Sequence, residues 1–183
     1  MKKIIFAALV GIISFIGLSF VPAASDPTVV IKKGVMKING VNVTADWSLS
    51  NFKKALGEPD RTRDGYNKTH TYDKKSIVLF EKMSDKKPSG TVSEAQFYFH
   101  VAESNKVTPD GPAFSGTIKV DKLVVTRNLS ATTMLAKLKK WEKTDSHIEH
   151  SYRMASNGLY IYFQFNDSED KLEKISVGPD KKK

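Results

Sequence analysis

The chain has no cysteine among its 183 residues. Disulfide bonds, cysteine-linked lipids, thiolate metal ligands and thiol nucleophiles are therefore excluded, and stability must come from packing. The sequence also lacks a glycine-rich phosphate loop and a serine in a Gly-x-Ser-x-Gly turn. It therefore offers no recognisable nucleotide site and no esterase-type nucleophile.

Long apolar runs are also scarce, and the only one lies at the N-terminus. Two lysines precede it, it extends over residues 4–21, and small residues follow. This three-part pattern is typical of a secretory signal, so we expect residues 1–25 to be removed and the mature protein to be periplasmic or secreted. Because the run approaches the length of a membrane-spanning helix, an uncleaved anchor is the alternative. Only in that case do we expect association with a membrane.

Positive charge exceeds negative charge in the remaining chain. Without Lys2 and Lys3, 27 basic residues remain against 20 acidic ones. A scattered excess of this kind is typical of a solvated surface, and the functional alternative is a protein partner with an acidic surface. No motif for nucleic acid binding is present in a chain that we expect to be exported, so we expect no nucleic acid partner. We expect no cofactor either.

The sequence matches itself at a shift of 80 residues. Three ordered matches carry this repeat: Ile38 with Ile118, Leu49-Ser50 with Leu129-Ser130, and His70-Thr71-Tyr72 with His150-Ser151-Tyr152. Matches that keep their order predict two diverged copies of one small unit. We place these units at residues 26–102 and 115–183, joined by a polar linker at 103–114 that contains proline and glycine.

Each unit opens with two predicted strands and a helix. The strands are expected at 35–38 with 41–44 and at 117–120 with 123–126, and the Asn39-Gly40 pair between the first two favours a tight turn. Helices are then expected from near Ser48 or Ser50 and from near Asn128 or Ser130, because these side chains can cap the free amides of an apolar-faced helix.

Three more strands complete each unit. They are expected at 69–73, 77–82 and 92–101, and at 147–154, 159–165 and 172–177. Residues 159–165 are almost all apolar or aromatic, which predicts a central strand covered on both faces. The predicted fold class is therefore α+β, with two tandem diverged ββαβββ units, each an antiparallel sheet with one helix packed on a face.

Two groups of residues are candidates for a site. Asp60, Arg61, Arg63 and Tyr66 combine turn chemistry, forked guanidinium groups and an aromatic ring, which favours contact with a protein partner. The alternatives for this segment are carboxylate chemistry or a solvated loop with local ion pairs.

The second group is a His-x-Tyr pair in each unit, His70 with Tyr72 and His150 with Tyr152. Residues two apart share a strand face, so these four side chains could line a pocket between the units. Packing at a sheet edge is the structural alternative. We expect no metal site, because His147 and His150 would point to opposite faces of a strand. No triad is apparent, so we assign no catalytic residue and do not expect an enzyme.

Three motifs lie between residues 38 and 80: Asn39-Gly40, Leu49-x-x-Phe52-x-x-x-Leu56-Gly57-x-Pro59-Asp60-Arg61 and Tyr72-Asp73-x-x-x-Ile77. Through them the segment resembles an uncharacterised family of exported Gram-negative domains, whose members resemble immunity-type or small envelope proteins. The resemblance implies no catalytic residue. Tandem α+β units are also similar in architecture to secreted inhibitors of β-lactamase.

Together these observations predict an exported, protein-binding module of the immunity or inhibitor type that caps a partner protein. The alternative is an envelope hydrolase or a small-ligand-binding protein with a site between the two units.

Overall fold

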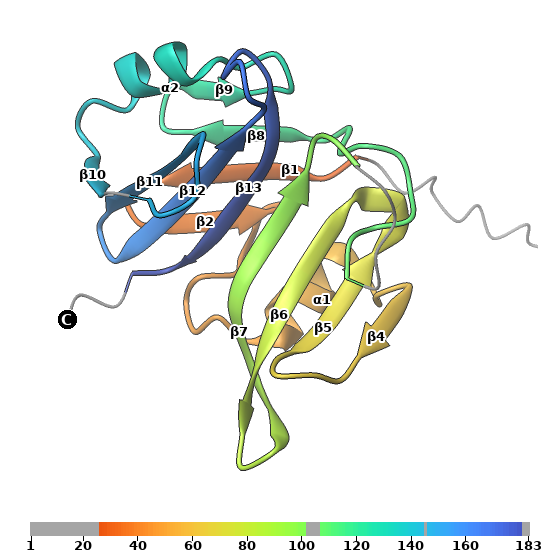
Figure 1. Cartoon of the computed structure of the whole chain (residues 1–183). Helices are drawn as coiled ribbons and strands as arrows, with labels where there is room; N and C mark the ends of the chain where they lie inside the picture. Colours follow the sequence, from red (N-terminus) through yellow and green to blue (C-terminus); the bar gives the residue numbers. More distant parts are fainter. Residues whose placement is uncertain (1–25, 102–106, 145, 181–183) are drawn as a thin grey trace, which may run out of the picture.

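The computed structural model describes residues 26–101, 107–144 and 146–180, and the predicted signal segment at residues 1–25 lies outside them (Figure 1). Two β-sheets pack against each other, with the five-stranded sheet behind the eight-stranded one in this view. Among the described residues, no helix has the length and apolar character needed to span a membrane. The fold is therefore mostly β-sheet, with two short helices, and belongs to the α+β class.

The five-stranded sheet has the strand order β3-β2-β1-β8-β9. Its strands are β1 (Thr28–Lys32), β2 (Val35–Ile38), β3 (Val41–Asn42), β8 (Thr117–Val120) and β9 (Leu123–Val125). The neighbours β1 and β8 run parallel, with Val29 opposite Ile118, and the other pairs are antiparallel. This sheet therefore joins the two halves of the chain along its middle.

The eight-stranded sheet is antiparallel throughout and has the order β10-β11-β12-β13-β7-β6-β5-β4. Its first-half strands are β4 (Arg61–Arg63), β5 (Lys68–Tyr72), β6 (Ile77–Ser84) and β7 (Lys87–Tyr98). Its second-half strands are β10 (Glu142–Thr144), β11 (Ser151–Ser156), β12 (Leu159–Phe165) and β13 (Leu172–Pro179). The halves meet where β7 pairs with β13, and the strand order on one side of that junction mirrors the other.

The helices are α1 (Leu49–Leu56) and α2 (Ala131–Lys137), and a 3-10 turn, η1 (Asp73–Lys75), follows β5. As predicted, serines cap both helices: the Ser48 and Ser130 hydroxyls accept hydrogen bonds from amides three residues further on. Helix α1 buries Phe52 and contacts β2, β3 and β7, so it packs between the two sheets.

One continuous core fills the space between the sheets. Fully buried side chains come from both halves of the chain and from both sheets, including Ile31, Phe97, Ile118 and Phe163. The two halves therefore share this core.

The ββαβββ layout predicted for each unit differs from the structure. The prediction omitted β1, whose turn into β2 places Lys33 and Gly34 at positive φ of 51° and 75°. It also omitted β4 and β10, the short strands after each helix. Furthermore, both halves contribute strands to each of the two sheets, a sharing that the sequence left open. Joining β7 to β13 pairs two strand edges that separate units would leave open.

Two local predictions were wrong in the second half. Strand β12 is not covered on both faces, because Leu159, Ile161 and Phe163 are buried while Tyr160 and Tyr162 are half-buried on the other side. The strand predicted at 147–154 begins only at Ser151, so the opposite-face argument for His147 and His150 does not hold.

The described part of the predicted linker packs on the first half. The ring of Phe114 meets those of Phe97 and Phe99 edge to face, with centroids 5.5 and 5.6 Å away. Gly111 approaches the Asp73 carbonyl so closely that a Cβ would lie 2.0 Å from its oxygen. Residues 107–114 are therefore part of the folded body.

Candidate functional site

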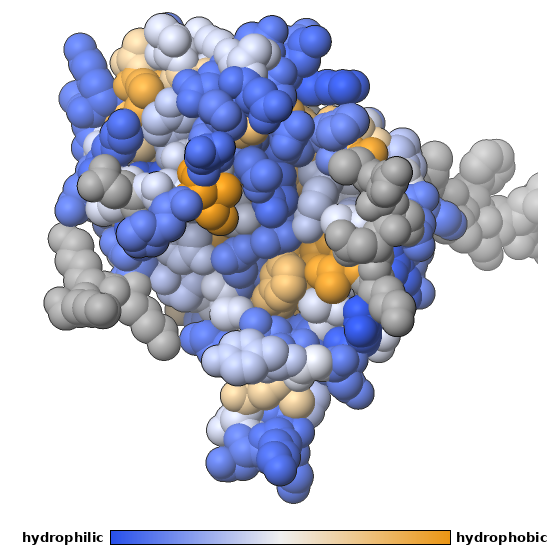
Figure 2. All heavy atoms as spheres, in the orientation of Figure 1, coloured by the Kyte–Doolittle hydropathy of each residue, from blue (hydrophilic) through white to orange (hydrophobic). Residues whose placement is uncertain are grey.

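The candidate site lies on the outer face of the eight-stranded sheet, by which we mean the side chains pointing away from the five-stranded sheet. Figure 2 shows this face, in the orientation of Figure 1, as mainly hydrophilic with separate apolar patches. Strand alternation places its residues: where Ile161 and Phe163 enter the core, Tyr160, Tyr162 and Gln164 project outward.

Cross-strand register brings residues from four strands together around the β7 and β13 junction. The neighbouring sets are Tyr160 with Gly178; Arg153, Tyr162, Ser176 and Gln96; and Gln164, Lys174 and Tyr98. Each half of the chain contributes, since Gln96 and Tyr98 belong to β7 and the others to β11, β12 and β13. The surface therefore exists only in the assembled sheet.

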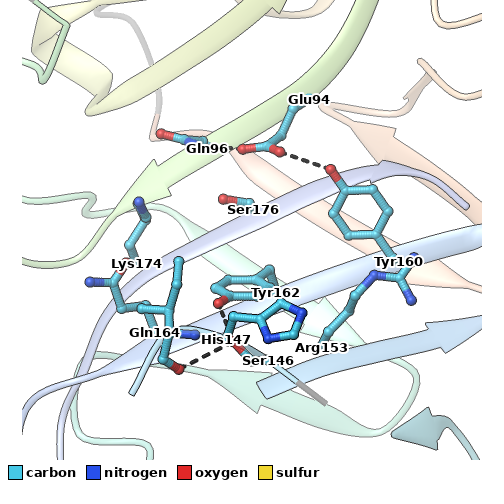
Figure 3. Close-up of a pocket in the computed structure, with 11 residues that line it drawn as sticks. Glu94, Gln96, Ser146, His147, Arg153, Tyr160, Tyr162, Gln164, Lys174 and Ser176 are labelled. Atoms are coloured by element: carbon cyan, nitrogen blue, oxygen red, sulfur yellow. Dashed lines mark hydrogen bonds between the residues drawn. The ribbon is translucent and has the colours of Figure 1, made fainter. Parts of the chain in front are cut away.

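A chain of hydrogen bonds fixes these side chains (Figure 3). The Tyr98 hydroxyl donates to Gln96 Oε1 at 2.6 Å, and Gln96 Nε2 donates to Glu94 Oε1, also at 2.6 Å. From the other half, the Tyr160 hydroxyl donates to Glu94 Oε2 at 2.8 Å. Both oxygens of Glu94 thus accept a hydrogen bond, and the surface is ordered before any ligand arrives.

Arg153 holds Tyr160 from the opposite side. Its guanidinium carbon lies 4.9 Å from the centroid of the Tyr160 ring, a cation–π arrangement. The same group is anchored by Asp180, whose Oδ1 lies 2.6 Å from Nη2, and by a 3.1 Å hydrogen bond to Thr144 Oγ1. Tyr160 is therefore fixed between a cation and a carboxylate.

These residues surround a hollow of about 610 Å³. Its far wall is the loop before β11, where Ser146 Oγ hydrogen bonds to the Tyr162 hydroxyl and accepts from the Ile148 amide at 3.1 Å. Ile148 lies on the rim with 57% of its surface exposed. An apolar rim beside fixed polar groups suits the insertion of a projecting side chain from a partner.

Burial shifts the pKa of two phenols at this surface, Tyr160 in the lining of the hollow and Tyr98 beside it. It raises the pKa of Tyr98 to about 12 and raises the pKa of Tyr160 further, with Glu94 adding to both. Burial lowers the pKa of Lys174, whose Nζ lies 5.7 Å from the centroid of the Tyr98 ring. The hollow thus offers neutral donors and one half-buried ammonium. Within its described lining, neither Ser146 nor Ser176 hydrogen bonds to a histidine, so a Ser-His nucleophile is not formed there.

A second hollow, of about 310 Å³, adjoins the first on the same face. It is lined by Arg63 and Tyr66 together with Thr69, Phe80 and Val107. Phe80 is the cross-strand partner of Glu94, which connects the two hollows across β6 and β7. Of the sequence-predicted residues, Arg63 and Tyr66 therefore belong to the outer face, and Tyr66 is 96% exposed.

The other two residues predicted in this segment are placed differently. Arg61 is held within the protein: Nε lies 3.0 Å from Asp73 Oδ2, and Nη2 donates to the Thr108 carbonyl at 2.5 Å. This pairing lowers the pKa of Asp73 and raises the pKa of Arg61. Asp60 is exposed at the start of β4, where its amide donates to the Thr71 carbonyl. The expected local ion pairs are therefore present, and Arg61 fastens residues 107–110 to the first half.

The structure does not bring together His70, Tyr72, His150 and Tyr152. Four strands separate β5 from β11, which at about 4.8 Å per strand spacing puts the pairs about 24 Å apart. The predicted pocket formed by all four is therefore wrong. The pairs resemble each other in only one respect, which is that each histidine meets a glutamate.

In the first half this contact is buried. His70 Nε2 lies 2.8 Å from Glu81 Oε2, with the side chains 4% and 3% exposed, and Tyr72 separately donates to the Gly57 carbonyl. In the second half, His150 and Tyr152 both bind Glu169, with about a third of the His150 and Glu169 side chains exposed. These hydrogen bonds lower the pKa of Glu169 and raise that of Tyr152.

Among the described residues, no group of three or more His, Asp or Glu side chains is arranged to hold a metal ion. The candidate residues that the sequence did not predict are those lining the larger hollow. Only β7 carries a sequence signal for them, because its alternation sets Glu94 and Gln96 opposite the buried Ala95 and Phe97. Residues 159–165 were predicted to be covered on both faces, so Tyr160 and Tyr162 were not predicted to face outward.

The fold and its hollows define a two-sheet α+β protein with an open polar face. It belongs to the family described as Domain of unknown function (DUF7738), whose model matches residues 28–135. That match runs from the first residue of β1 into α2 and crosses the predicted linker. It therefore includes all five strands of the smaller sheet.

Two solved structures are similar to this chain at low sequence identity. A DUF4309 family protein, YjgB, from Bacillus subtilis has a TM-score of 0.42 and 11% identity over 73% of this chain and 78% of its own. A cysteine-rich secretory protein, SAV1118, from Staphylococcus aureus has a TM-score of 0.34 and 13% identity over 72% of this chain and 42% of its own. No curated protein matches the sequence.

Proposed function

We propose that this protein is an exported binding module of the immunity or inhibitor type, which caps a partner protein with the outer face of the eight-stranded sheet. One observation carries the proposal: Tyr98, Gln96, Glu94 and Tyr160 form a fixed hydrogen-bonded row beside an open hollow. The predicted secretory signal supports a periplasmic or secreted location.

The residue types support recognition of a protein. Tyrosine and arginine supply large contact areas with few rotatable bonds, and they are enriched among residues that dominate binding energy. Tyr160 and Arg153 are already held in place, so little conformational entropy remains to be lost on binding. From β4 to β11 the face measures about 29 Å at about 4.8 Å per strand, which suits an interface of about 800 Å² per partner.

We also infer that the two halves arose by duplication. In each half, strands of the smaller sheet, a capped helix and four strands of the larger sheet follow in that order, although the first half has the extra strand among β1, β2 and β3. Strands β4 to β7 are mirrored by β10 to β13 across the β7 and β13 junction. Duplication would widen the recognition face without creating a catalytic centre, which favours binding over catalysis.

The alternative function is binding of a small ligand between the halves. The larger hollow favours it, because about 610 Å³ falls in the range of ligand sites and the lining comes from both β7 and β12. The two functions predict contact surfaces of different size. A small ligand would use only the larger hollow, whereas a protein partner would also contact Tyr66 in the smaller one.

Affinity capture from an extract of exported proteins, followed by titration of the purified partner, tests the proposal. We expect Tyr66→Ala combined with Ile148→Ala to weaken binding at least tenfold, which corresponds to about 1.4 kcal/mol. Val124→Ala is the matched control, since Val124 is 52% exposed on the other sheet. Equal affinity of the wild type, the double variant and the Val124→Ala control would refute the proposed surface. Loss with Tyr162→Ala but not with Tyr66→Ala would favour the small-ligand alternative.

A further inference from the structure

The outward face of the five-stranded sheet is rich in exposed lysines. Five exposed lysines project from its strands and turns: Lys32, Lys33, Lys37, Lys119 and Lys122. The end of α2 and the turn after it add three more, Lys137, Lys139 and Lys140, also exposed. We call these eight residues the lysine face.

Two hollows show that these lysines form one surface. One, of about 390 Å³, brings Lys32 and Lys122 beside the three lysines that end α2. The other, of about 350 Å³, brings Lys32 together with Lys33 and Lys37. Lys32 is common to both. Register then places Lys119 beside Val30 on β1 and Val124 on β9, which extends the surface across the sheet.

The lysine face carries the net positive charge of the described residues. Its hollows contain a single acidic residue, Asp121, whose Oδ2 accepts a hydrogen bond from the Trp141 indole at 2.9 Å. The described residues carry 23 basic and 18 acidic side chains, so without the eight lysines and Asp121 they carry 15 basic and 17 acidic ones. The net positive charge of the described residues therefore lies on the lysine face.

Apolar side chains stand among the lysines. Val30 is 37% exposed and Val124 is 52% exposed, two of the four large apolar residues that are exposed among the described residues. A soluble polyanion supplies negative charge but no apolar layer to cover these valines. A bilayer with anionic headgroups supplies both, because lysines meet the phosphates while short apolar side chains enter the boundary beneath them.

We propose that the lysine face docks the folded protein on an anionic lipid surface, independently of the apolar segment at residues 4–21. The two sheets pack face to face, so docking through the five-stranded sheet directs the outer face of the eight-stranded sheet away from the bilayer. The protein in this arrangement is held at a membrane while its hydrogen-bonded hollow stays open.

Co-sedimentation with vesicles tests this docking. The protein is purified after export by its host, so that any processing of the N-terminal segment has already taken place. The probes are vesicles of phosphatidylcholine alone and vesicles in which about one third of the lipid is phosphatidylglycerol. We expect binding only to the anionic vesicles, and weaker binding as salt is raised. The variant Lys32→Glu with Lys37→Glu and Lys119→Glu should lose at least about tenfold in partitioning, since each lysine near such a surface contributes appreciably.

The matched control is Lys74→Glu with Lys86→Glu and Lys87→Glu, three exposed lysines outside the lysine face. It changes the net charge equally, so it should retain most of the wild-type binding. Equal loss in both triple variants, or equal binding to both vesicle types, would overturn the proposal. So would tight binding of soluble inorganic polyphosphate without binding to anionic vesicles. Val30→Ser with Val124→Ser keeps every charge and should still lose about threefold if these valines enter the boundary. If charge reversal prevents folding, the same test applies to the three Lys→Gln changes.

Discussion

The ring of Tyr160 occupies the space that a side chain at position 178 would need. A Cβ built on Gly178 would lie 2.6 Å from the Tyr160 hydroxyl oxygen and 2.7 Å from two ring carbons. The two residues are cross-strand partners on β12 and β13. Because position 178 has no side chain, Tyr160 can cross β13 and reach Glu94 on β7. One glycine thus links the two halves of the candidate site.

Substitution of that glycine should disturb both the fold and the site. In Gly178→Ala the methyl group must displace the Tyr160 ring, so we expect a loss of about 1–3 kcal/mol in the free energy of unfolding. Urea denaturation measures this loss. The control is the same substitution in a Tyr160→Ala background, where the obstacle is absent and the cost should largely disappear. A cost that persists there would show that Gly178 matters for another reason.

The two histidine–glutamate contacts should differ in their contribution to stability. Glu81→Ala leaves His70 buried without its partner and removes the acceptor of the Gly90 amide at 2.6 Å, so we expect a loss of about 3–5 kcal/mol. Glu169→Ala is the control, because water reaches that glutamate and His150, and its effect should be a small fraction of the first. Chemical denaturation of the two variants compares them directly. Equal losses would contradict the distinction drawn from burial.

The Arg61 and Asp73 pair should contribute to stability in a pH-dependent way. Pairing lowers the pKa of Asp73 in the folded state, so the folded protein binds this proton less readily than the unfolded chain. The contribution is therefore present above the ordinary aspartate pKa of about 3.9 and is lost as the pH falls through the lowered value.

Asp73→Asn should remove this contribution, so its stability should fall below that of the wild type at neutral pH and approach it in acid. Arg61→Ala should return the pKa of Asp73 toward its usual range, as measured by NMR titration. It should also speed amide hydrogen exchange at Asp110, whose N–H donates to Asp73 Oδ1 at 2.8 Å. Unchanged exchange at Asp110 would show that Arg61 does not fasten residues 107–110.

Local sequence signals predicted most of the strands and both helix starts. Asn39-Gly40 predicted the β2 to β3 turn, with positive φ of 49° and 82°, and the strand expected at 92–101 overlaps the second part of β7, where Ala95 and Phe97 are buried. These features depend on neighbours in the chain. The turn from β1 to β2 also contains a glycine, at Lys33-Gly34, and both residues have positive φ. No strand was predicted at β1.

These local signals cannot predict which distant strands pair with each other. Nothing local states that β1 lies parallel to β8 or that β7 joins β13, because both pairings follow from burying the apolar faces of two half-units at once. The site depends on the same pairings, since Tyr160 meets Glu94 only across the β7 and β13 junction. The exposure of Tyr66 was predictable because a turn presents it locally, whereas His70 and Tyr72 are buried because their strand also faces the core.

Hydroxyl-radical footprinting of the protein with its captured partner tests most directly whether the outer face is the recognition surface. We expect Tyr66, Tyr162 and Ile148 to lose reactivity in the complex while Val30 and Val124, on the other sheet, keep theirs. Protection of Val30 and Val124 with Tyr66 and Ile148 still reactive would contradict the central claim.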